Sequence, residues 1–373
     1  MFYDYTQLPH AGIRTLAPYI PGKSAEALAR EQGLTNILKL ASNENPLGCS
    51  QAAVDALSTL PAHLIATYTV STQHPLRQKL AHALDLDPEM LMLSNGSDAL
   101  FHLLLVCFAL HTGKHILTHE AAFISYEVQA KTLGIEAHHI PLKPDWQVDI
   151  DAMIHACTEK TALIFIANPN NPTGLLVPQA EINRLLDHIP ATTLLVLDEA
   201  YHEYLAPTAQ STPSVLLAKY PNLVITRTFS KAYGLAALRL GYALANPVII
   251  ALLYQIQLPF AVNQAAMLAA IAALDDQAFV QQTILVNAEG REHMQKGLSN
   301  LNLVQLPSAC NFITFDCGHD AAMMNKRLQH EGIIVRPLTP YGLTRHLRVT
   351  IGTPEQNTRF IETLHHCIKG TNQ

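Results

Sequence analysis

The 373-residue chain carries a formal net charge of -6, with 49% hydrophobic and only 14% charged residues. It is long enough for two domains, and its apolar composition favours burial of surface between subunits, so we expect a homo-oligomer. The acidic balance and the lack of lysine and arginine clusters among aromatic residues argue against a nucleic-acid partner.

Short β-rich runs alternate with helical stretches between about residue 90 and residue 245. The run LMLS (91–94) precedes the helix-like SDALFHLLLVCFAL (97–110). Four further apolar runs follow, namely HILT (115–118), ALIFIA (162–167), LLVL (194–197) and LVIT (223–226). Such alternation is typical of a mostly parallel sheet with crossover helices, so the sequence predicts an α/β fold.

Polar residues follow several of these runs: SNG (94–96), NP (168–169) and DE (198–199). Ligands of open α/β sheets bind at the carboxyl ends of the strands, so we expect these segments to converge on one crevice.

The two ends of the chain differ in composition from the region between about residue 90 and residue 245. The first 40 residues are punctuated by Pro and Gly, and an Ala-rich helical stretch begins after about residue 265. We expect a large domain at 45–260 and a smaller domain built from 1–44 and 261–373.

A lysine close to hydroxyls and a cation forms the strongest candidate site. The run TRTFSK (226–231) ends at Lys231, and Arg239 follows eight residues later. A lysine amine can condense with an aldehyde, while a nearby cation and hydroxyls can hold a phosphate and depress the pKa of the amine. Taken alone, the run also fits an exposed lysine near an exposed arginine.

Two further segments would supply groups for a pyridine ring. Asp198 begins DEAY (198–201), and pyridoxal phosphate needs a carboxylate against its ring nitrogen; capping of a following helix is the other role for this Asp. Tyr201 can reach the ring hydroxyl. NPNNPTG (168–174) has the composition of a turn, yet Asn171 could donate to the same ring oxygen.

The segment NGSD (95–98) lies between a strand-like run and a long helix-like run. Backbone amides and the helix dipole bind phosphate at such a place, although a plain Ser or Asp N-cap fits equally. No GxGxxG motif occurs between a strand and a helix, so a dinucleotide is not implied.

Six segments together carry a resemblance: LASNENPLG (40–48), NGSDAL (95–100), NPNNPTG (168–174), DEAYHEY (198–204), RTFSKAYGLAALRLGY (227–242) and HLRVTIGT (346–353). In this combination the chain resembles the histidinol-phosphate aminotransferase family, in order and over nearly its whole length from PYIPGK (18–23). The lysine, DEAY and NPTG elements are shared by fold type I aminotransferases broadly. LASNENPLG, NGSDAL and IGTPEQN (351–357) narrow the resemblance from these aminotransferases to the histidinol-phosphate aminotransferase family. The resemblance implies a fold type I aminotransferase, an α/β protein with a mostly parallel central sheet flanked by helices plus a smaller α/β domain.

The resemblance also implies a role for each matching residue. Lys231 would hold pyridoxal 5′-phosphate as a Schiff base and then move the proton between the substrate Cα and the cofactor's C4′. Asp198 would pair with the ring nitrogen, and Asn171 and Tyr201 with the ring hydroxyl. Phe123 would stack on the ring, with an ordinary core Phe as the alternative. The cofactor phosphate would be held by Gly96, Ser97, Asp98, Thr228, Ser230, Arg239 and Tyr68 of a second subunit.

The substrate side of the resemblance rests on two arginines that follow strand-like runs, Arg336 and Arg348. Arginine binds phosphate or carboxylate through a planar fork, whereas a surface ion pair is its ordinary role. By resemblance both bind the phosphate of histidinol phosphate in one half-reaction and a carboxylate of glutamate in the other. Asn43 would also contact the substrate, and Tyr19 would help close the small domain over it. The implied reaction converts L-histidinol phosphate and 2-oxoglutarate to imidazole acetol phosphate and glutamate, in histidine biosynthesis.

The chain departs from the family pattern at Ala99, at Thr69-Val70 and at Ala121-Ala122. These departures weaken the assignment of Tyr68 and leave room for a changed substrate. An aminotransferase for aromatic or aspartate-like amino acids is one alternative, and a threonine-phosphate decarboxylase of the same fold is another. A third is a regulator that senses pyridoxal phosphate, which would need an N-terminal DNA-binding domain, whereas this chain begins directly with the enzyme-like segment.

Other classes of protein and site are not favoured. No apolar run approaches the ~18 residues that span a bilayer, and no signal peptide is visible, so we expect a cytoplasmic protein. The six cysteines are scattered without a CxxC pair and are expected to be free thiols. The histidines include the adjacent pairs His138-His139 and His365-His366, but neighbouring helix positions do not face one another and no HExxH motif occurs. We therefore expect no metal.

Overall fold

The computed structural model describes residues 4–16 and 23–369. Its largest sheet has seven strands in the order β2-β8-β7-β6-β5-β3-β4. Neighbouring strands in it run parallel, except where β8 pairs antiparallel with β7 and β2. The strands are β2 (Leu91–Ser94), β3 (His115–His119), β4 (Ala137–Ile140), β5 (Thr161–Ala167), β6 (Leu194–Asp198), β7 (Leu223–Thr228) and β8 (Gly241–Ala245). This sheet confirms the expected α/β fold.

The central strands are apolar along their whole length because both faces of the sheet are covered. Every residue of β5, β6 and β7 is buried. Along β5, Leu163 and Phe165 belong to one hydrophobic cluster, whereas Ile164 and Ile166 belong to another on the opposite face. Parallel strands packed on both faces read as continuous apolar runs, which is the pattern from which the sequence predicts them.

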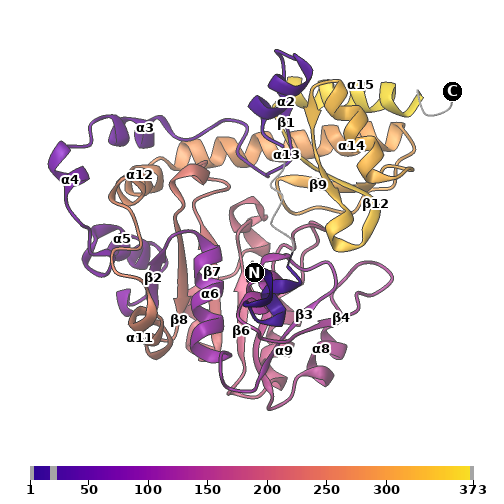
Figure 1. Ribbon diagram of the computed structural model, residues 1–373. Helices are drawn as coiled ribbons and strands as arrows, with labels where there is room; N and C mark the ends of the chain where they lie inside the picture. The colour runs from indigo at the N-terminus through magenta and orange to yellow at the C-terminus, as the bar shows by residue number, and fades with distance from the viewer. Residues whose placement is uncertain (1–3, 17–22, 370–373) are drawn as a thin grey trace.

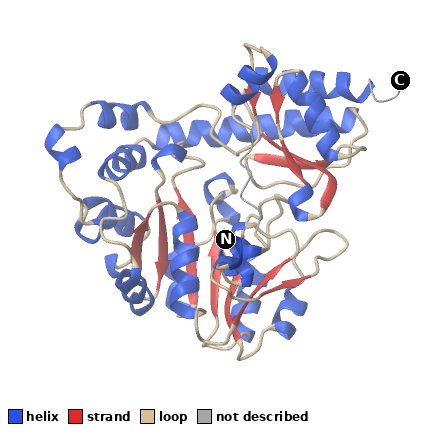
Figure 2. Ribbon diagram, in the orientation of Figure 1, coloured by secondary structure: helices blue, strands red, loops and turns tan. Residues whose placement is uncertain are grey.

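Helices form a layer on each face of this sheet, as Figures 1 and 2 show. One cluster includes α6 (Ser97–Phe108), α7 (Ser125–Thr132) and α11 (Pro247–Ile256). The other cluster includes α3 (Gln51–Ser58), α5 (Pro75–Ala83), α8 (Ile150–Ala156), α9 (Gln179–His188), α10 (Pro213–Lys219) and α12 (Gln264–Asp275). A short helix, α4 (Ala62–Ala66), lies between α3 and α5 in the chain.

A second layered unit lies above the carboxyl ends of the central strands (Figure 1). Its three-stranded antiparallel sheet has the order β11-β12-β9, with β9 (Phe312–Asp316), β11 (Arg336–Leu338) and β12 (Leu343–Thr350). The helices around it are α2 (Ala25–Gln32), α13 (Gln277–Asn300), α14 (Ala321–His330) and α15 (Pro354–Lys369). The N-terminal strand β1 (Leu38–Lys39) pairs in parallel with β10 (Ile333–Ile334), which ties the start of the chain to this unit.

Several smaller features bear on the exclusions made from sequence. The described part of the chain contains no helix that is both long and apolar enough to cross a membrane. All six cysteines are free thiols, and three of them, Cys310, Cys317 and Cys367, are buried. Both adjacent histidine pairs are exposed.

Near the N-terminus, α1 (Ala11–Arg14) packs on α7.

Candidate active site

A cavity of about 560 Å³ lies where the segments after β5, β6 and β7 meet the start of α6 and the strands β11 and β12. The structure brings most of the predicted site residues into its wall: Asn43, Ser97, Asp98, Phe123, Asn171, Asp198, Tyr201, Thr228, Ser230, Lys231, Arg239, Arg336 and Arg348. The polar segments at the carboxyl ends of the strands therefore do converge, as the topology requires.

Lys231 follows β7 and places its amine inside this cavity. Its Nζ donates to the carbonyl oxygen of Ser42 at 3.2 Å and lies 5.8 Å from the centre of the Tyr201 ring. Burial, followed by the nearby Arg348 guanidinium, lowers the pKa of Lys231 to about 8. Because a neutral amine is the nucleophile toward an aldehyde, this environment increases the reactive fraction near neutral pH.

Asp198 is the last residue of β6 and is almost completely buried. The Tyr126 hydroxyl donates to its Oδ2 at 2.8 Å, and the Thr226 hydroxyl to its Oδ1 at 3.2 Å. Burial raises the pKa of Asp198 to about 6, while the Tyr126 hydrogen bond acts in the opposite direction. The 3-10 helix that follows, His202–Tyr204, has Tyr201 as its N-cap, so the Asp198 side chain is not placed as its cap.

Tyr201 and Asn171, the two residues expected near a ring hydroxyl, are hydrogen-bonded to Asn43 and Arg348, respectively. Asn43 Nδ2 donates to the Tyr201 hydroxyl at 2.9 Å, and burial raises the pKa of this phenol. Arg348 Nη1 donates to Asn171 Oδ1 at 2.5 Å, which leaves the Asn171 amide nitrogen as its donor. Arg348 Nη2 donates to the carbonyl of Ala41 at 2.8 Å, so the arginine joins the segment before α3 to the turn after β5.

The end of the cavity where α6 begins has the features of a site for an anion. Gly96 is the N-cap residue of α6 and has a φ of 77°. The first N–H groups of this 12-residue helix face this end of the cavity. A Cβ at Gly96 would lie 2.6 Å from Arg239 Nη2, which shows how closely the guanidinium approaches. Arg239 Nη1 donates to Ser230 Oγ at 3.2 Å, and Thr228 Oγ1 to the same oxygen at 3.0 Å.

Arg336 and Arg348 are cross-strand partners in the antiparallel pair β11–β12. Directly opposed residues in such a pair lie on the same face of the sheet, and both side chains line the cavity. Arg348 is buried with its guanidinium 5.2 Å from the centre of the Phe312 ring, whereas Arg336 is less buried. The sequence named both arginines but did not show that they are direct neighbours.

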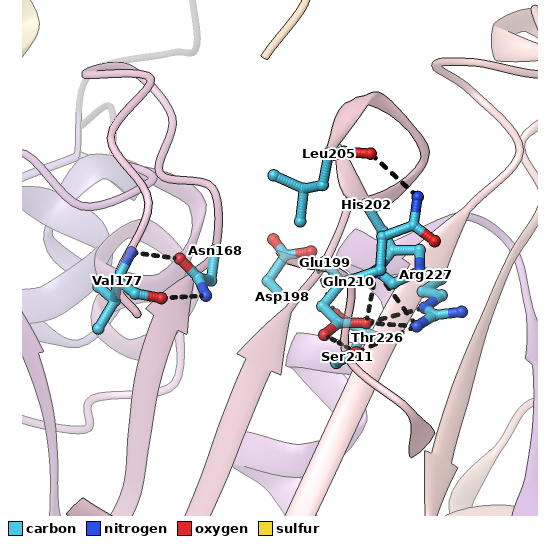
Figure 3. A network of polar contacts seen from close by, with 10 residues as sticks. All are labelled: Asn168, Val177, Asp198, Glu199, His202, Leu205, Gln210, Ser211, Thr226 and Arg227. Carbon is cyan, nitrogen blue, oxygen red and sulfur yellow. Dashed lines mark hydrogen bonds and ion pairs between the residues drawn. The ribbon is translucent and has the colours of Figure 1, made fainter. Parts of the chain in front are cut away.

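A buried ion pair lies behind this wall, on the opposite face of the same strands (Figure 3). Arg227 Nε donates to Glu199 Oε2 at 2.8 Å, and Nη2 lies 2.7 Å from the same oxygen. Ser211 Oγ donates to Glu199 Oε1 at 2.5 Å. Burial lowers the pKa of His202 to about 4, so its neutral Nδ1 accepts from Arg227 Nη2 at 3.3 Å. Sequence reasoning missed this network, which connects β6 to β7.

Two predicted residues within the described part of the chain, Gly96 and Tyr68, do not line the cavity, although Gly96 directly precedes α6 as its N-cap. Tyr68 is 82% exposed and stacks on Phe260, with their ring centres 4.3 Å apart. Tyr19 lies outside the described residues. Conversely, the wall includes Ser125 and Tyr341, which the sequence did not single out, and Tyr126 supports it from behind.

The residues present fit pyridoxal phosphate. A carboxylate at the end of β6, a helix N-terminus with Arg239, and the Lys231 amine all face one cavity. Its volume of about 560 Å³ falls within the range usual for small-molecule sites. A pyridine nitrogen, a phosphate and an aldehyde are the three groups that these side chains would engage.

Comparison with known proteins places this geometry in context. Residues 35–364 match the family described as aminotransferase class I and II. The chain is 55% identical over 364 residues to histidinol-phosphate aminotransferase 2 of Legionella pneumophila (strain Lens), covering 98% of this chain and 99% of that protein. Histidinol-phosphate aminotransferase 1 of Mannheimia succiniciproducens is 42% identical, covering 96% and 98%. The crystal structure of histidinol-phosphate aminotransferase from Sinorhizobium meliloti in complex with pyridoxal-5′-phosphate is 28% identical with a TM-score of 0.87, covering 98% of each chain.

Proposed function

The chain belongs to the aminotransferase class I and II family and, within it, to the histidinol-phosphate aminotransferases, and on that premise we propose that it transfers the amino group of L-histidinol phosphate to 2-oxoglutarate. The products are imidazole acetol phosphate and glutamate, in a step of histidine biosynthesis. The enzyme is a transaminase with the fold type I architecture, and its cofactor is pyridoxal phosphate. The observation that carries the substrate proposal is that Arg336 and Arg348 face the same cavity as Lys231.

The residues in and next to the cavity wall would hold the cofactor at five places. Lys231 would bind it covalently, and Asp198 would pair with the ring nitrogen. Tyr201 and Asn171 would bind the ring hydroxyl, and Phe123 would cover one face of the ring. The phosphate would lie at the start of α6, against Gly96, Ser97, Asp98, Thr228, Ser230 and Arg239. When bound, pyridoxal phosphate supplies an aldehyde that takes up the amino group and a protonated ring that withdraws electrons from the substrate carbon.

Each of these side chains has a task that its surroundings support. Asp198 is ionised at neutral pH because its pKa is about 6, so it can hold a proton on a pyridine nitrogen. The amine of Lys231, with a pKa of about 8, is suited to accept the proton from the substrate Cα and to return one later. The Tyr201 phenol stays protonated because burial raises its pKa, so it can donate a hydrogen bond.

The two arginines would bind both substrates between which the amino group is exchanged. Histidinol phosphate carries a phosphate and no carboxylate, whereas glutamate carries carboxylates. A guanidinium forms paired hydrogen bonds with either anion, so one arginine pair serves both half-reactions. Asn43, next to Tyr201, would lie within reach of the bound substrate.

The test of this function is a panel of amino donors with 2-oxoglutarate as the acceptor. We expect glutamate to form with the highest kcat/KM from histidinol phosphate, well above phenylalanine and aspartate, and to be absent in Lys231→Ala. Threonine phosphate is included while carbon dioxide is measured. A higher kcat/KM for an aromatic amino acid, or release of carbon dioxide, would assign the site to another reaction of this fold.

We also propose that the enzyme is a homodimer in which Tyr68 reaches the cofactor phosphate of the other subunit. Tyr68 lies beside the exposed apolar side chains of Ile65 and Phe260. Such exposed apolar side chains suit an interface between copies of the chain. The proposal predicts complementation: a heterodimer of Lys231→Ala and Tyr68→Ala subunits contains one intact site, so activity should reappear. Two inactive parents that remain inactive as a purified heterodimer would contradict it.

The division into a large domain (45–260) and a small domain (1–44 with 261–373) remains a proposal. It is supported by the separate hydrophobic cluster around β9 and β12. The helix α12 falls in the second range but packs on α3 in the first, so it would join the two domains. The role of Tyr19 in closing the site also stays a prediction.

A further inference from the structure

Tyr126 connects two groups of the cavity wall that would contact the cofactor ring. It lies in the first turn of α7 and is completely buried. Its hydroxyl donates to Asp198 Oδ2 at 2.8 Å. The centre of its ring lies 5.6 Å from that of Phe123, with an interplanar angle of 84°, so the edge of one ring meets the face of the other.

We propose that Tyr126 is a positioning residue, which fixes the Asp198 carboxylate and keeps it ionised while its ring supports Phe123. The proposal rests on the assignment of Asp198 to the ring nitrogen made above. Tyr126 itself does not line the cavity, so it acts through these two neighbours.

The hydroxyl acts on the charge of Asp198. A carboxylate buried without hydrogen bonds would take up a proton instead of staying charged. Tyr126 and Thr226 each donate to one of its two oxygens, and the hydrogen bond from Tyr126 is the shorter. Burial raises the pKa of the Tyr126 phenol well above its ordinary value, so this donor keeps its proton across the working pH range. Without it, Asp198 would bind its own proton more strongly and hold less charge against a pyridine nitrogen.

Aromatic packing holds the phenol in place. Its ring is stacked on Phe165 of β5, with centres 4.8 Å apart, and meets Phe101 of α6 edge-on at 4.9 Å. A ring enclosed in this way cannot rotate its hydroxyl away from Asp198 without disturbing the core of the sheet. The donor and the support of Phe123 are therefore fixed together by one side chain.

Tyr126→Phe separates these effects because it removes only the hydroxyl. The measurement is the affinity of the apoenzyme for pyridoxal phosphate between pH 5 and pH 9, followed by absorbance. We expect the affinity at neutral pH to fall about tenfold, as for the loss of a hydrogen bond to a charged group. The pH below which affinity declines should move upward by about one unit. Without the hydroxyl, the pKa of Asp198 is higher, so at a given acid pH a larger fraction of the protein carries a neutral Asp198.

Tyr220→Phe is the matched control. Tyr220 is also a buried tyrosine, but it lies just before β7, at the end of the strand opposite to the cavity. We expect its affinity and pH profile to match those of the wild type. Thr226→Val removes the longer hydrogen bond to Asp198 and should shift the profile in the same direction by a smaller amount.

The outcomes separate this inference from the proposed function. A wild-type apoenzyme that fails to bind pyridoxal phosphate would reject the function itself. A normal wild type with an unshifted profile in Tyr126→Phe would overturn the role of Tyr126 alone, as would an equal shift in Tyr220→Phe. If Tyr126→Phe does not fold, Thr226→Val decides the matter, and an unshifted profile there counts against the proposal.

Discussion

The proposal that Arg348 binds the substrate anion makes a quantitative prediction for Arg348→Ala. A hydrogen-bonded contact from a guanidinium to a substrate anion contributes about 1.5–3 kcal/mol, which corresponds to roughly ten- to a hundredfold in kcat/KM. Arg348 also donates to Asn171 and to the Ala41 carbonyl, so its loss releases a residue expected at the ring hydroxyl as well. We therefore expect the upper part of this range, and in both half-reactions. Arg336→Ala should also slow both half-reactions, by roughly tenfold, because Arg336 lies opposite Arg348 on the same sheet face but is less buried.

The assay is stopped-flow absorbance of the bound cofactor, with histidinol phosphate and glutamate in separate experiments. Arg345→Ala is the control, because Arg345 lies in the same strand but is exposed and paired with Asp316 at 3.1 Å. It should leave both half-reactions unchanged. An Arg348→Ala enzyme with unaltered histidinol phosphate kinetics would refute the proposal that Arg348 binds the anions of both substrates, and would favour an ordinary amino-acid aminotransferase.

Three further results are expected. Asp198→Asn should bind pyridoxal phosphate more weakly and, even when saturated with it, slow each half-reaction by orders of magnitude, since the proposed anionic partner of the ring nitrogen is lost; near-normal single-turnover rates would contradict this. The rate at which apoenzyme captures pyridoxal phosphate should rise with pH and level off above about 8, because neutral Lys231 is the nucleophile; a rise continuing past pH 10 would mean an ordinary lysine. Glu199→Ala leaves Arg227 buried without its carboxylate, so the free energy of unfolding in urea should fall by about 3–5 kcal/mol, and a loss below about 1 kcal/mol would show that the pair contributes little.

The sequence predicts the fold largely through its central strands. Each of the five apolar runs is a strand, and the structure extends LVIT to Thr228 at the end of β7. Buried parallel strands leave an unmistakable apolar pattern, whereas β4 (AHHI) is an edge strand with two exposed histidines and carries little signal. The polar residues after the strands lie together because parallel strands share one carboxyl edge.

The parts of the site that the sequence missed depend on contacts between distant segments. Nothing near Tyr126 indicates that its hydroxyl meets Asp198, 72 residues away. The Arg227–Glu199 pair requires knowledge that β6 and β7 are neighbours and that their side chains alternate between faces. The opposition of Arg336 and Arg348 similarly follows from strand register. For Asp98, the sequence named the residue but not the engagement of its carboxylate with Ser125, at 2.6 Å.

A single-turnover titration tests the central claim most directly. Purified enzyme with bound pyridoxal phosphate is mixed with histidinol phosphate in the absence of any oxoacid, and its visible absorbance is recorded. The account predicts that the band is lost with one equivalent of imidazole acetol phosphate formed per subunit, and that 2-oxoglutarate restores it with release of glutamate. A band that persists, or one that returns without 2-oxoglutarate, would contradict the assignment of this chain as a histidinol-phosphate aminotransferase.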